Sequence, residues 1–371
     1  MNSNDLPYWI TLNRINGVGP ATFCRLVDFF GSPRGVLRAG IKELTQVEGI
    51  RPQIAEAIVR DGKDLGPAEK ELQKVERIGT MSLGARVIPY LSPEYPFRLK
   101  QTAGFPPYLY VRGNLTNFNE IDWLGVVGSR DSSEYGVTVC RRIVREVVRA
   151  GVGVVSGFAR GIDITAHETA LDSKGKTVAV LGCGLNIVYP QENARYVDAV
   201  LENGAFVTEF ACDEQPRPEF FPRRNRIISG ISRGVLVVEA GEKSGSLITA
   251  QYALDQNRDV YAVPGSVMTP SAKGSNRLIQ QGARLVGSGR EILDDWKYAS
   301  PAGEASPHEA SLKEDPEEAS ICRVCLEIPA TPDDMVERTG LPAERVTVLL
   351  TKLELEGRIR SLPGGRYVTF S

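Results

Sequence analysis

Apolar runs alternate with amphipathic stretches through the middle of the chain, and this alternation predicts its main domain. Short runs rich in valine and other β-branched residues each lead into a small-residue turn, as buried parallel strands do. With their turns, these runs occupy residues 124–130, 153–157, 177–184, 205–210, 235–238, 259–265 and 284–286. The stretches between them predict helices at 135–149, 165–173, 192–203, 246–256 and 291–296. Strands and helices that alternate in this way form a doubly wound, mostly parallel α/β sheet with right-handed crossovers.

Two copies of one pattern precede this domain. Residues 15–20 (Ile-Asn-Gly-Val-Gly-Pro) come before a helical run at 21–30, and residues 47–52 (Val-Glu-Gly-Ile-Arg-Pro) come before another at 53–60. Glycine allows a tight hairpin with positive φ, and proline fits the first helical turn. The pattern resembles a pair of helix-hairpin-helix units, which hold a DNA phosphate on such turns. The second copy has Arg51 in place of a glycine, and a helical module for packing or dimer contacts is the alternative interpretation.

A polar helix at 63–83 and a segment rich in proline and tyrosine lead from this module to the main domain. Proline at the density of residues 88–96 and 105–111 is incompatible with helix interiors. We therefore expect short strands and turns in that segment.

The end of the chain predicts a linker and a small domain. Residues 300–320 are rich in Ala, Pro, Ser and Glu without apolar periodicity, which is typical of a disordered, acidic linker. Three helices and two strands about a Pro-Gly-Gly turn follow and predict a winged helix: 320–327, 331–339, 342–356 and 357–370. Its third helix carries few cations, Arg345 and Lys352, so a protein-contact or dimer role is an alternative to DNA reading.

Length, net charge and cysteine count limit the classes of protein to which the chain can belong. A length of 371 residues suggests two or three domains, and the net charge of −2 means that any site for a polyanion must be local. No apolar run reaches the roughly 18–20 residues that span a bilayer, and the first residues do not resemble a signal peptide. Six scattered cysteines favour a reducing compartment. We expect a soluble cytoplasmic protein with no membrane partner.

Local positive charge is concentrated before the strand at 235–238. Arg223, Arg224 and Arg226 lie within four positions, and the turn at 243–246 (Lys-Ser-Gly-Ser) opens the next helix. Helix beginnings present free N–H groups and a positive dipole end, so they favour phosphate beside guanidinium groups. Arginines dispersed over a solvated helix face are the alternative.

Ligands of such sheets bind outside the carboxyl ends of the strands. Small residues there let a backbone approach the ligand, and guanidinium groups neutralise its charge. The candidate binding residues at these ends are Gly128, Ser129, Arg130, Ser156, Gly157, Arg160, Gly161, Arg223, Arg224, Asn225, Arg226, Lys243, Ser244, Gly245 and Ser246. They predict a phosphate-rich ligand, either a nucleotide or a nucleic-acid backbone.

The sequence lacks the residues that other kinds of site require, namely dinucleotide, nucleoside-triphosphate, metal and nucleophilic catalytic sites. The turn at 182–187 misses the third glycine of a dinucleotide fingerprint, and the loop at 241–246 has its lysine before the glycine, unlike a Walker A loop. His167 has no second histidine at metal-ligand spacing, and the cysteine pair at 322 and 325 lacks two further ligands. No serine or cysteine has a credible histidine partner. We therefore expect no catalytic residue, cofactor or metal, a structural role for His167, and core packing for the cysteine pair.

Two carboxylates, Asp163 and Glu239, lie at the same edge of the predicted sheet. Each could serve as an acid or a base, but we expect each to orient a neighbouring arginine.

Six ordered blocks resemble the DNA-processing protein A family (DprA, also called Smf). They are Gly-Ser-Arg at 128–130, Ser-Gly-Phe-Ala-Arg-Gly-Ile-Asp at 156–163, Leu-Gly-Cys-Gly at 181–184, Phe-Pro-Arg-Arg-Asn-Arg at 221–226, Lys-Ser-Gly-Ser-Leu-Ile-Thr at 243–249 and Val-Pro-Gly at 263–265. The resemblance implies four parts: a helical helix-hairpin-helix/SAM-like domain at 1–83, an extended Rossmann-like domain at 84–298, a linker at 299–319 and a winged-helix domain at 320–371.

The resemblance also implies a function. Such proteins bind and protect single-stranded DNA in natural transformation, help to load the RecA recombinase, and form homodimers through the Rossmann-like domain; they are not enzymes. The family's cationic pocket falls on Arg130 and on residues 224–226 of this chain. Phe220 or Phe221 is the candidate for base stacking.

The alternative is a nucleotide-processing phosphoribohydrolase on a related Rossmann-like fold. Those enzymes carry a Pro-Gly-Gly-x-Gly-Thr loop, whereas residues 240–246 read Ala-Gly-Glu-Lys-Ser-Gly-Ser and the Pro-Gly-Gly here stands at 363–365.

Overall fold

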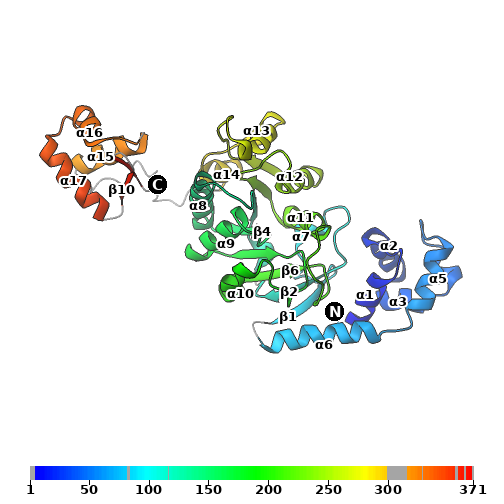
Figure 1. The fold of residues 1–371 in the computed structure, drawn as a ribbon. Helices are drawn as coiled ribbons and strands as arrows, with labels where there is room; N and C mark the ends of the chain where they lie inside the picture. Colours follow the sequence, from blue (N-terminus) through cyan, green and yellow to red (C-terminus); the bar gives the residue numbers. More distant parts are fainter. Residues whose placement is uncertain are drawn as a thin grey trace. The chain divides into compact units, whose positions relative to one another are not determined.

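A computed structural model describes residues 5–81, 84–115, 117–298, 316–327, 329–355, 358–362 and 365–369. Its contacts divide the chain into two compact units, residues 1–298 and 299–371, which are treated separately (Figure 1).

The larger unit begins with short helices that match the repeated sequence pattern. They are α1 (Leu6–Arg14), α2 (Pro20–Phe30), α3 (Pro33–Arg38), α4 (Ile41–Leu44), α5 (Pro52–Asp61) and α6 (Gly66–Met81). Pro20 and Pro52 start their helices, as predicted, because the missing N–H of proline costs nothing in the first turn. Gly17 and Gly49 adopt positive φ in the two preceding turns.

A nine-stranded sheet forms the centre of this unit. Its strands are β1 (Ala85–Pro89), β2 (Tyr108–Gly113), β3 (Trp123–Val127), β4 (Gly153–Ser156), β5 (Thr177–Val180), β6 (Gly204–Thr208), β7 (Gly234–Val237), β8 (Asp259–Ala262) and β9 (Arg284–Leu285). They lie in the order β1-β2-β6-β5-β4-β3-β7-β8-β9. The strands from β6 to β9 along this order are parallel, and β1 and β2 are antiparallel. The predicted doubly wound, mostly parallel sheet is confirmed.

Helices cover both faces of the sheet (Figure 1). Their bounds are α7 (Phe97–Lys100), α8 (Glu134–Arg149), α9 (Ile162–Asp172), α10 (Val197–Asn203), α11 (Phe220–Ile231), α12 (Ser246–Asp255), α13 (Lys273–Gln280) and α14 (Gly289–Asp295), with short 3₁₀ turns η2 (Phe118–Glu120), η3 (Gln191–Tyr196) and η4 (Pro270–Ala272). Side chains of β7 alternate between the two layers: Leu236 packs in the cluster of α8 and α9, and Val235 and Val237 in the cluster of α11 and α12.

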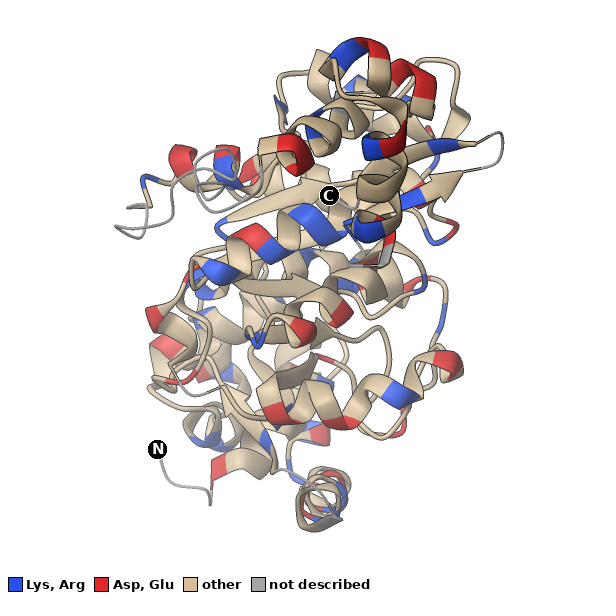
Figure 2. Ribbon diagram, turned by 90° about the vertical axis from the view of Figure 1, so that its left-hand side faces the viewer, with Lys and Arg blue, Asp and Glu red and all other residues tan. Residues whose placement is uncertain are grey.

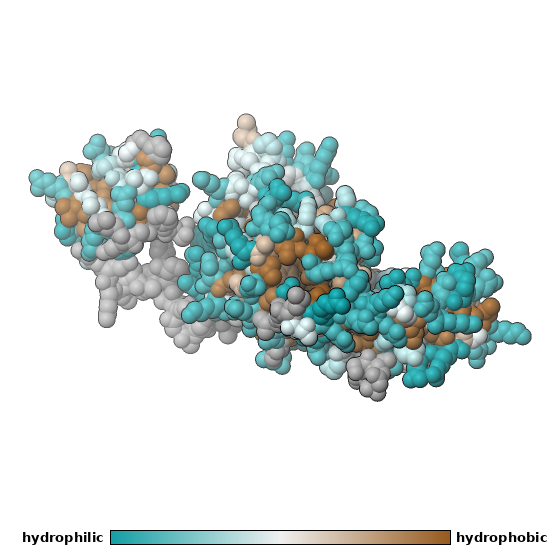
Figure 3. Space-filling model, turned by 60° about the horizontal axis from the view of Figure 1, so that its bottom comes forward, coloured by the Kyte–Doolittle hydropathy of each residue, from teal (hydrophilic) through white to brown (hydrophobic). Residues whose placement is uncertain are grey.

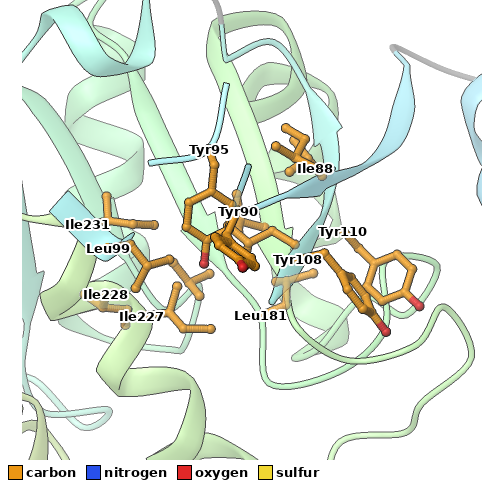
Figure 4. Packing of buried hydrophobic residues seen from close by; sticks show 14 of the residues in the cluster. Ile88, Tyr90, Tyr95, Leu99, Tyr108, Tyr110, Leu181, Ile227, Ile228 and Ile231 are labelled. Atoms are coloured by element: carbon orange, nitrogen blue, oxygen red, sulfur yellow. The ribbon is translucent and has the colours of Figure 1, made fainter. Parts of the chain in front are cut away.

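The second of these clusters continues into the first helices of the chain. The ring of Tyr90, just after β1, packs against the rings of Trp9 and Phe105, with 5.4 and 5.3 Å between ring centres. Figure 4 shows Leu99 of α7 lying among the isoleucines of α11. The buried carboxylate of Glu71 on α6 accepts a hydrogen bond of 2.6 Å from the backbone N–H of Cys212. The helical segment and the sheet therefore share one apolar core.

The smaller unit has three helices and a hairpin, as a winged helix requires. They are α15 (Pro316–Glu327), α16 (Pro332–Thr339), α17 (Ala343–Leu355), β10 (Ile359–Leu362) and β11 (Arg366–Thr369). The first helix begins four residues earlier than expected, inside the predicted linker, because Glu318 there is buried and paired with Lys352 and Arg358. Cys325 packs in the core of this unit.

The surface is mostly hydrophilic on the side seen in Figure 3, with apolar residues gathered near the middle of the larger unit. Among the helices in the described ranges, none is long and apolar enough to cross a membrane.

One ionic cluster ties distant parts of the larger unit together and gives a testable expectation. Asp122 accepts hydrogen bonds of 2.6 Å from both Arg98 of α7 and Arg233 before β7, and one of 3.2 Å from the Tyr298 hydroxyl. Burial raises the pKa of Asp122, but the hydrogen bonds from the two arginines outweigh it, so the pKa lies below its ordinary value.

We expect Asp122→Asn to lower the free energy of unfolding by about 1–2 kcal/mol at neutral pH, because both arginines lose a charged partner. A carboxyl with a lowered pKa stabilises the fold above its ordinary pKa and loses that effect as the pH falls through the folded value. The difference between the two proteins should therefore shrink in acid. Urea unfolding at several pH values measures it, and Asp61→Asn, at an exposed pair with Arg60, is the control. An equal loss in both variants would contradict the expectation.

Candidate nucleic-acid interface

A cavity of about 910 Å³ opens at the carboxyl edge of the sheet, beside the ends of β3 and β7. Strand order reverses here, since β4 lies on one side of β3 and β7 on the other. Ligands of open α/β sheets bind at such a switch point. Three segments supply most of the lining: the turn after β3, the first turns of α11, and the turn between β7 and α12.

The turn after β3 is held tightly. A Cβ on Gly128 would stand 2.6 Å from Cγ1 of Ile162, so only glycine fits there. The Ser129 N–H donates to the Glu239 carbonyl at 2.7 Å, and the Ser129 carbonyl accepts from the Ile162 N–H at 3.1 Å. These contacts fix the residue that follows, Arg130.

Arg130 is exposed at this cavity, and its guanidinium lies 5.2 Å from the ring centre of Phe221. This cation–π contact orients the side chain without neutralising it. Within the described part of the chain, no carboxylate forms an ion pair with Arg130 or with Lys243, which is also exposed and lines the cavity. Two positive charges are therefore available to an anionic ligand.

Arg224 has a different place, at the floor of the cavity. Its buried side chain donates hydrogen bonds to the carbonyl group of Gly157, which follows β4, and to that of Val180, the last residue of β5. It also donates to Oδ1 of Asn225 at 3.0 Å. Burial lowers the pKa of Arg224 to about 10, although the Asp163 charge opposes this. The guanidinium stays charged at neutral pH and braces the strand ends.

Asp163 lines the cavity near Arg224 and is buried. Its Oδ2 accepts a hydrogen bond of 3.1 Å from the Gly157 N–H. Burial raises the pKa of Asp163, and the charge of Arg224 counteracts that shift. Within the described chain Asp163 forms no hydrogen bond or ion pair with an arginine, so Arg224 acts on it through charge alone and the expected orienting role stays a prediction.

Among the described residues no arginine pairs with the Glu239 carboxylate, so the expectation that it orients an arginine is wrong. Its Oε2 accepts from the Ser133 N–H at 3.0 Å and from the Ser133 hydroxyl at 2.9 Å, where α8 begins. A carboxylate at a helix N-terminus is stabilised by the dipole and the free N–H groups, which explains the preference.

The turn after β7 brings small polar groups to the cavity. The Ser244 and Ser246 hydroxyls lie 2.7 Å apart, and the Asn225 amide donates to the Gly245 carbonyl at 3.3 Å. One helical turn later, Thr249 is 1% exposed and lines the cavity, and its hydroxyl has no hydrogen-bond partner among the described residues. Thr249 therefore keeps an unused hydroxyl donor and acceptor beside the cavity.

The structure brings together nine of the predicted residues as cavity lining: Gly128, Ser129, Arg130, Arg224, Asn225, Lys243, Ser244, Gly245 and Ser246. The other six are not among the lining residues. Three of them, Ser156, Gly157 and Gly161, belong to the end of β4 and the turn that joins it to α9. There the Ser156 hydroxyl donates to the Val126 carbonyl at 2.6 Å, and Gly161 adopts a φ of +71°.

The remaining three are arginines that contact carboxylates and do not line the cavity, so the structure does not bring them together with the other nine. Arg226 and Arg223 both contact Oε2 of Glu209, at 2.6 and 3.2 Å, and Arg160 pairs with Glu192. The reason is helical geometry. Positions 223 and 226 are three apart and share one face of α11, toward Glu209, whereas position 224 is turned about 100° away.

Phe220 and Phe221 also differ. Phe220 is buried and stacked on Phe210, with 4.2 Å between ring centres. Phe221 lines the cavity, with Arg130 over its ring and Tyr189 at 5.7 Å. Of the two candidates for base stacking, only Phe221 is placed at the cavity.

Sequence reasoning missed Thr249, Tyr189 and the pair Pro270–Ser271 as lining residues. Thr249 lies one turn into a helix whose first residues were selected, so helical spacing could have identified it. The other residues come from loops far away in sequence and carried no local signal.

Outside the cavity, positively and negatively charged residues both occur on the chain's surface elements. Figure 2 shows basic and acidic residues interspersed over the side that faces the viewer. Among the described residues, no group of three or more His, Cys, Asp or Glu side chains could hold a metal ion.

Comparison with known proteins agrees with this architecture. The family model described as DNA recombination-mediator protein A matches residues 86–297, more than half of the chain. The chain belongs to the DNA recombination-mediator protein A family. A DprA winged helix domain model matches residues 304–365, and a SAM-like helix-hairpin-helix tandem model matches residues 10–64.

Relatives of this family cover most of the chain. Protein Smf of Escherichia coli (strain K12) is 42% identical over 287 residues, which are 75% of this chain and 76% of that protein. DNA processing protein DprA of Bacillus subtilis is 41% identical over 212 residues, 57% of this chain and 71% of its own. The X-ray structure of DprA from Streptococcus pneumoniae matches with a TM-score of 0.67 and 32% identity, covering 78% of this chain and 97% of that one.

His167, below the cavity, gives a prediction for pH dependence. It is buried, and its Nδ1 lies 2.6 Å from the Thr177 hydroxyl, so the predicted structural hydrogen bond is confirmed. Burial, aided by the Arg224 charge, lowers the pKa of His167 to about 3. Between that value and about 6.5, the unfolded chain binds a proton that the folded chain does not, so stability falls as the pH decreases.

We expect the free energy of unfolding to decrease between pH 7 and pH 4, with His167 contributing on the order of 2–4 kcal/mol. His167→Gln should flatten this dependence, measured by urea unfolding across the range. His308→Gln, which retains His167, is the matched control. Identical pH slopes for the parent and His167→Gln would refute the assignment.

Proposed function

We propose that this protein binds single-stranded DNA in the cytoplasm, protects incoming strands and helps to load the RecA recombinase during natural transformation. The cavity at the switch point between β3 and β7 carries the proposal, because it offers unpaired positive charge in a molecule whose net charge is −2. Arg130, Lys243 and the N-terminal end of α12 suit phosphate oxygens.

Base contacts complete this proposed site. Phe221 at the cavity has Tyr189 beside it, and Tyr189 is 40% exposed. An exposed aromatic face next to a cationic cavity suits the stacking of successive bases, which every nucleotide sequence allows.

We further propose that the protein is not an enzyme. Two of the carboxylates near the cavity are engaged in structure: Asp163 with the Gly157 N–H, and Glu239 with Ser133. His167 is buried and bonded to Thr177. None of these groups is placed as a poised acid or base in the geometry that catalysis of nucleotide hydrolysis requires.

Likeness to solved proteins is consistent with the proposal. The structure of DNA processing protein A from Helicobacter pylori, which gives insight into that protein's single-stranded DNA binding mode, matches with a TM-score of 0.53 and 24% identity over 58% of this chain and 98% of that one. At this identity the likeness concerns the fold, and the proposed binding rests on the cavity described above.

The first helix-hairpin-helix turn is the better candidate for an additional DNA contact. Gly17 is at a φ of +86°, and Gly19 caps α2 with open space around it. In the second turn, Arg25 donates to the Glu48 carbonyl at 3.0 Å and lies against Gly49, so its side chain covers the backbone that would approach a phosphate.

We also propose a homodimer through the Rossmann-like domain. A groove of about 290 Å³ lies between α12 and α13 next to the β9 edge of the sheet. Leu254 lines this groove and is 52% exposed, and Leu285 on β9 is 49% exposed. Exposed leucines beside a short edge strand suit contact with a second copy.

For DNA binding, we expect Arg130→Ala to raise the Kd for a single-stranded oligonucleotide about tenfold, since one charged phosphate contact is lost. The slope of log K against log salt should decrease by about 0.7. Thr249→Val, which replaces the hydroxyl with a methyl group, should raise the Kd about threefold without changing the slope. Fluorescence anisotropy at several salt concentrations measures both effects.

The control for charge is Arg290→Ala on α14, where Arg290 pairs with Asp294 outside the cavity. It should bind like the parent. If Arg130→Ala also binds like the parent, or if the parent itself shows no salt-dependent binding, the proposed site is wrong.

For the dimer, Leu254→Glu should reduce the molar mass in solution from that of two chains to that of one, because a carboxylate cannot be buried unpaired. Light scattering measures the mass, and Leu91→Glu, at another exposed leucine, should leave it unchanged. A monomeric parent would refute the dimer, and a dimeric Leu254→Glu variant would refute this interface.

A further inference from the structure

A second feature of the carboxyl edge is unusually apolar. The loop after β8 presents Val267 and Met268, whose side chains are 79% and 85% exposed, the highest values among the exposed large hydrophobic residues of the described chain. Adjacent apolar side chains with this exposure are unfavourable in water unless they meet a partner.

The loop is held in place despite its exposure. The side-chain amide of Asn276 on α13 accepts from the Gly265 N–H at 3.1 Å and donates to the Gly265 carbonyl at 2.9 Å. Ser266 bonds to the Met268 N–H through its hydroxyl at 3.3 Å, and to the Thr269 N–H through its carbonyl at 3.0 Å. The two apolar side chains are therefore presented on an ordered turn, and a partner would lose little entropy by contacting them.

This turn stands between two cavities. The residues just after it, Pro270 and Ser271, line the cavity with Arg130. A second cavity, of about 490 Å³, is lined by Ser266 and Thr269 on either side of the two apolar residues, and it shares Ser271 with the first. A chain that leaves the first cavity on this side passes Val267 and Met268.

The two cavities differ in charge. The first cavity is lined by Arg130, Arg224 and Lys243 together with Asp131 and Asp163, whereas the described lining of the second includes the buried carboxylate of Glu239 and no lysine or arginine. Phosphate therefore meets cationic side chains in the first cavity and none in the lining of the second. A strand whose phosphates follow Arg130 and Lys243 would turn its bases toward the apolar turn.

We propose that Val267 and Met268 form a contact for the bases of single-stranded DNA that leaves the cationic cavity. The proposal rests on the proposed function. Base faces are apolar and accept stacking or side-on contact from any apolar side chain, and the flexible thioether of methionine adapts to each base. In duplex DNA the faces are hidden between neighbouring pairs, so this turn favours single strands over double strands. Because every base offers such a face, no sequence preference results.

The test is the double variant Val267→Ser/Met268→Ser, which removes apolar surface from exposed positions without changing the backbone bonds of the turn. We expect its Kd for a single-stranded oligonucleotide to rise about tenfold, within the range for loss of one base contact. The slope of log K against log salt should stay as in the parent, since no phosphate contact is lost. Binding to duplex DNA, and to a strand of abasic sites, should be equal for variant and parent.

Leu91→Ser is the matched control, since Leu91 is 46% exposed and lies outside both cavities. If the parent binds single strands and the double variant binds them equally well, the inference is wrong while the proposed function stands. An equal loss on abasic or duplex DNA, or a loss that accompanies a lower molar mass in light scattering, would also overturn it. A parent that binds no single strand refutes the proposed function itself.

Discussion

The candidate site depends on one buried interaction, the hydrogen bonds of the Arg224 guanidinium with the ends of β4 and β5. A buried guanidinium must have its donors satisfied, and here the carbonyl groups of Gly157 and Val180 satisfy them. The bonds fix the beginning of α11 above the carboxyl edge of the sheet. They also require Gly157, because a Cβ there would lie 2.2 Å from the Arg224 Nη1 atom.

From this interaction the rest of the cavity follows. With α11 fixed, the face that carries Phe221, Asn225 and Ile228 lines the cavity, since these positions repeat at helical spacing. Asn225 then reaches the Gly245 carbonyl and places the turn that opens α12. Phe221 supports Arg130, which comes from the opposite side. The side chain that holds the site together is thus distinct from the exposed cations that a ligand would meet.

The sequence was sufficient for the fold because its signals were local. Valine-rich runs, proline at helix starts and glycine turns each specify an element, and alternation specifies the parallel sheet. Most turns of the cavity were also predictable, since they follow strand ends. The separate roles of Arg223, Arg224 and Arg226 could not be predicted from the sequence. Whether Arg224 is a brace and Arg226 a partner of Glu209 depends on which side of α11 meets the sheet, and this is decided by tertiary packing.

The same reasoning explains why an overall negative molecule can be suited to a polyanion. Several arginines near the site are compensated by carboxylates, since Arg223 and Arg226 share Glu209 and Arg160 pairs with Glu192, so the positive field at long range is reduced. What remains is short-range: two unpaired cations, a helix N-terminus and an unbonded hydroxyl around one cavity. A weak long-range field reduces attraction to duplex DNA in general. A ligand that enters the cavity and also offers bare bases to Val267 and Met268 gains contacts that a duplex does not. Selectivity for single strands would then arise from shape and apolar contact, with charge supplying affinity at the centre.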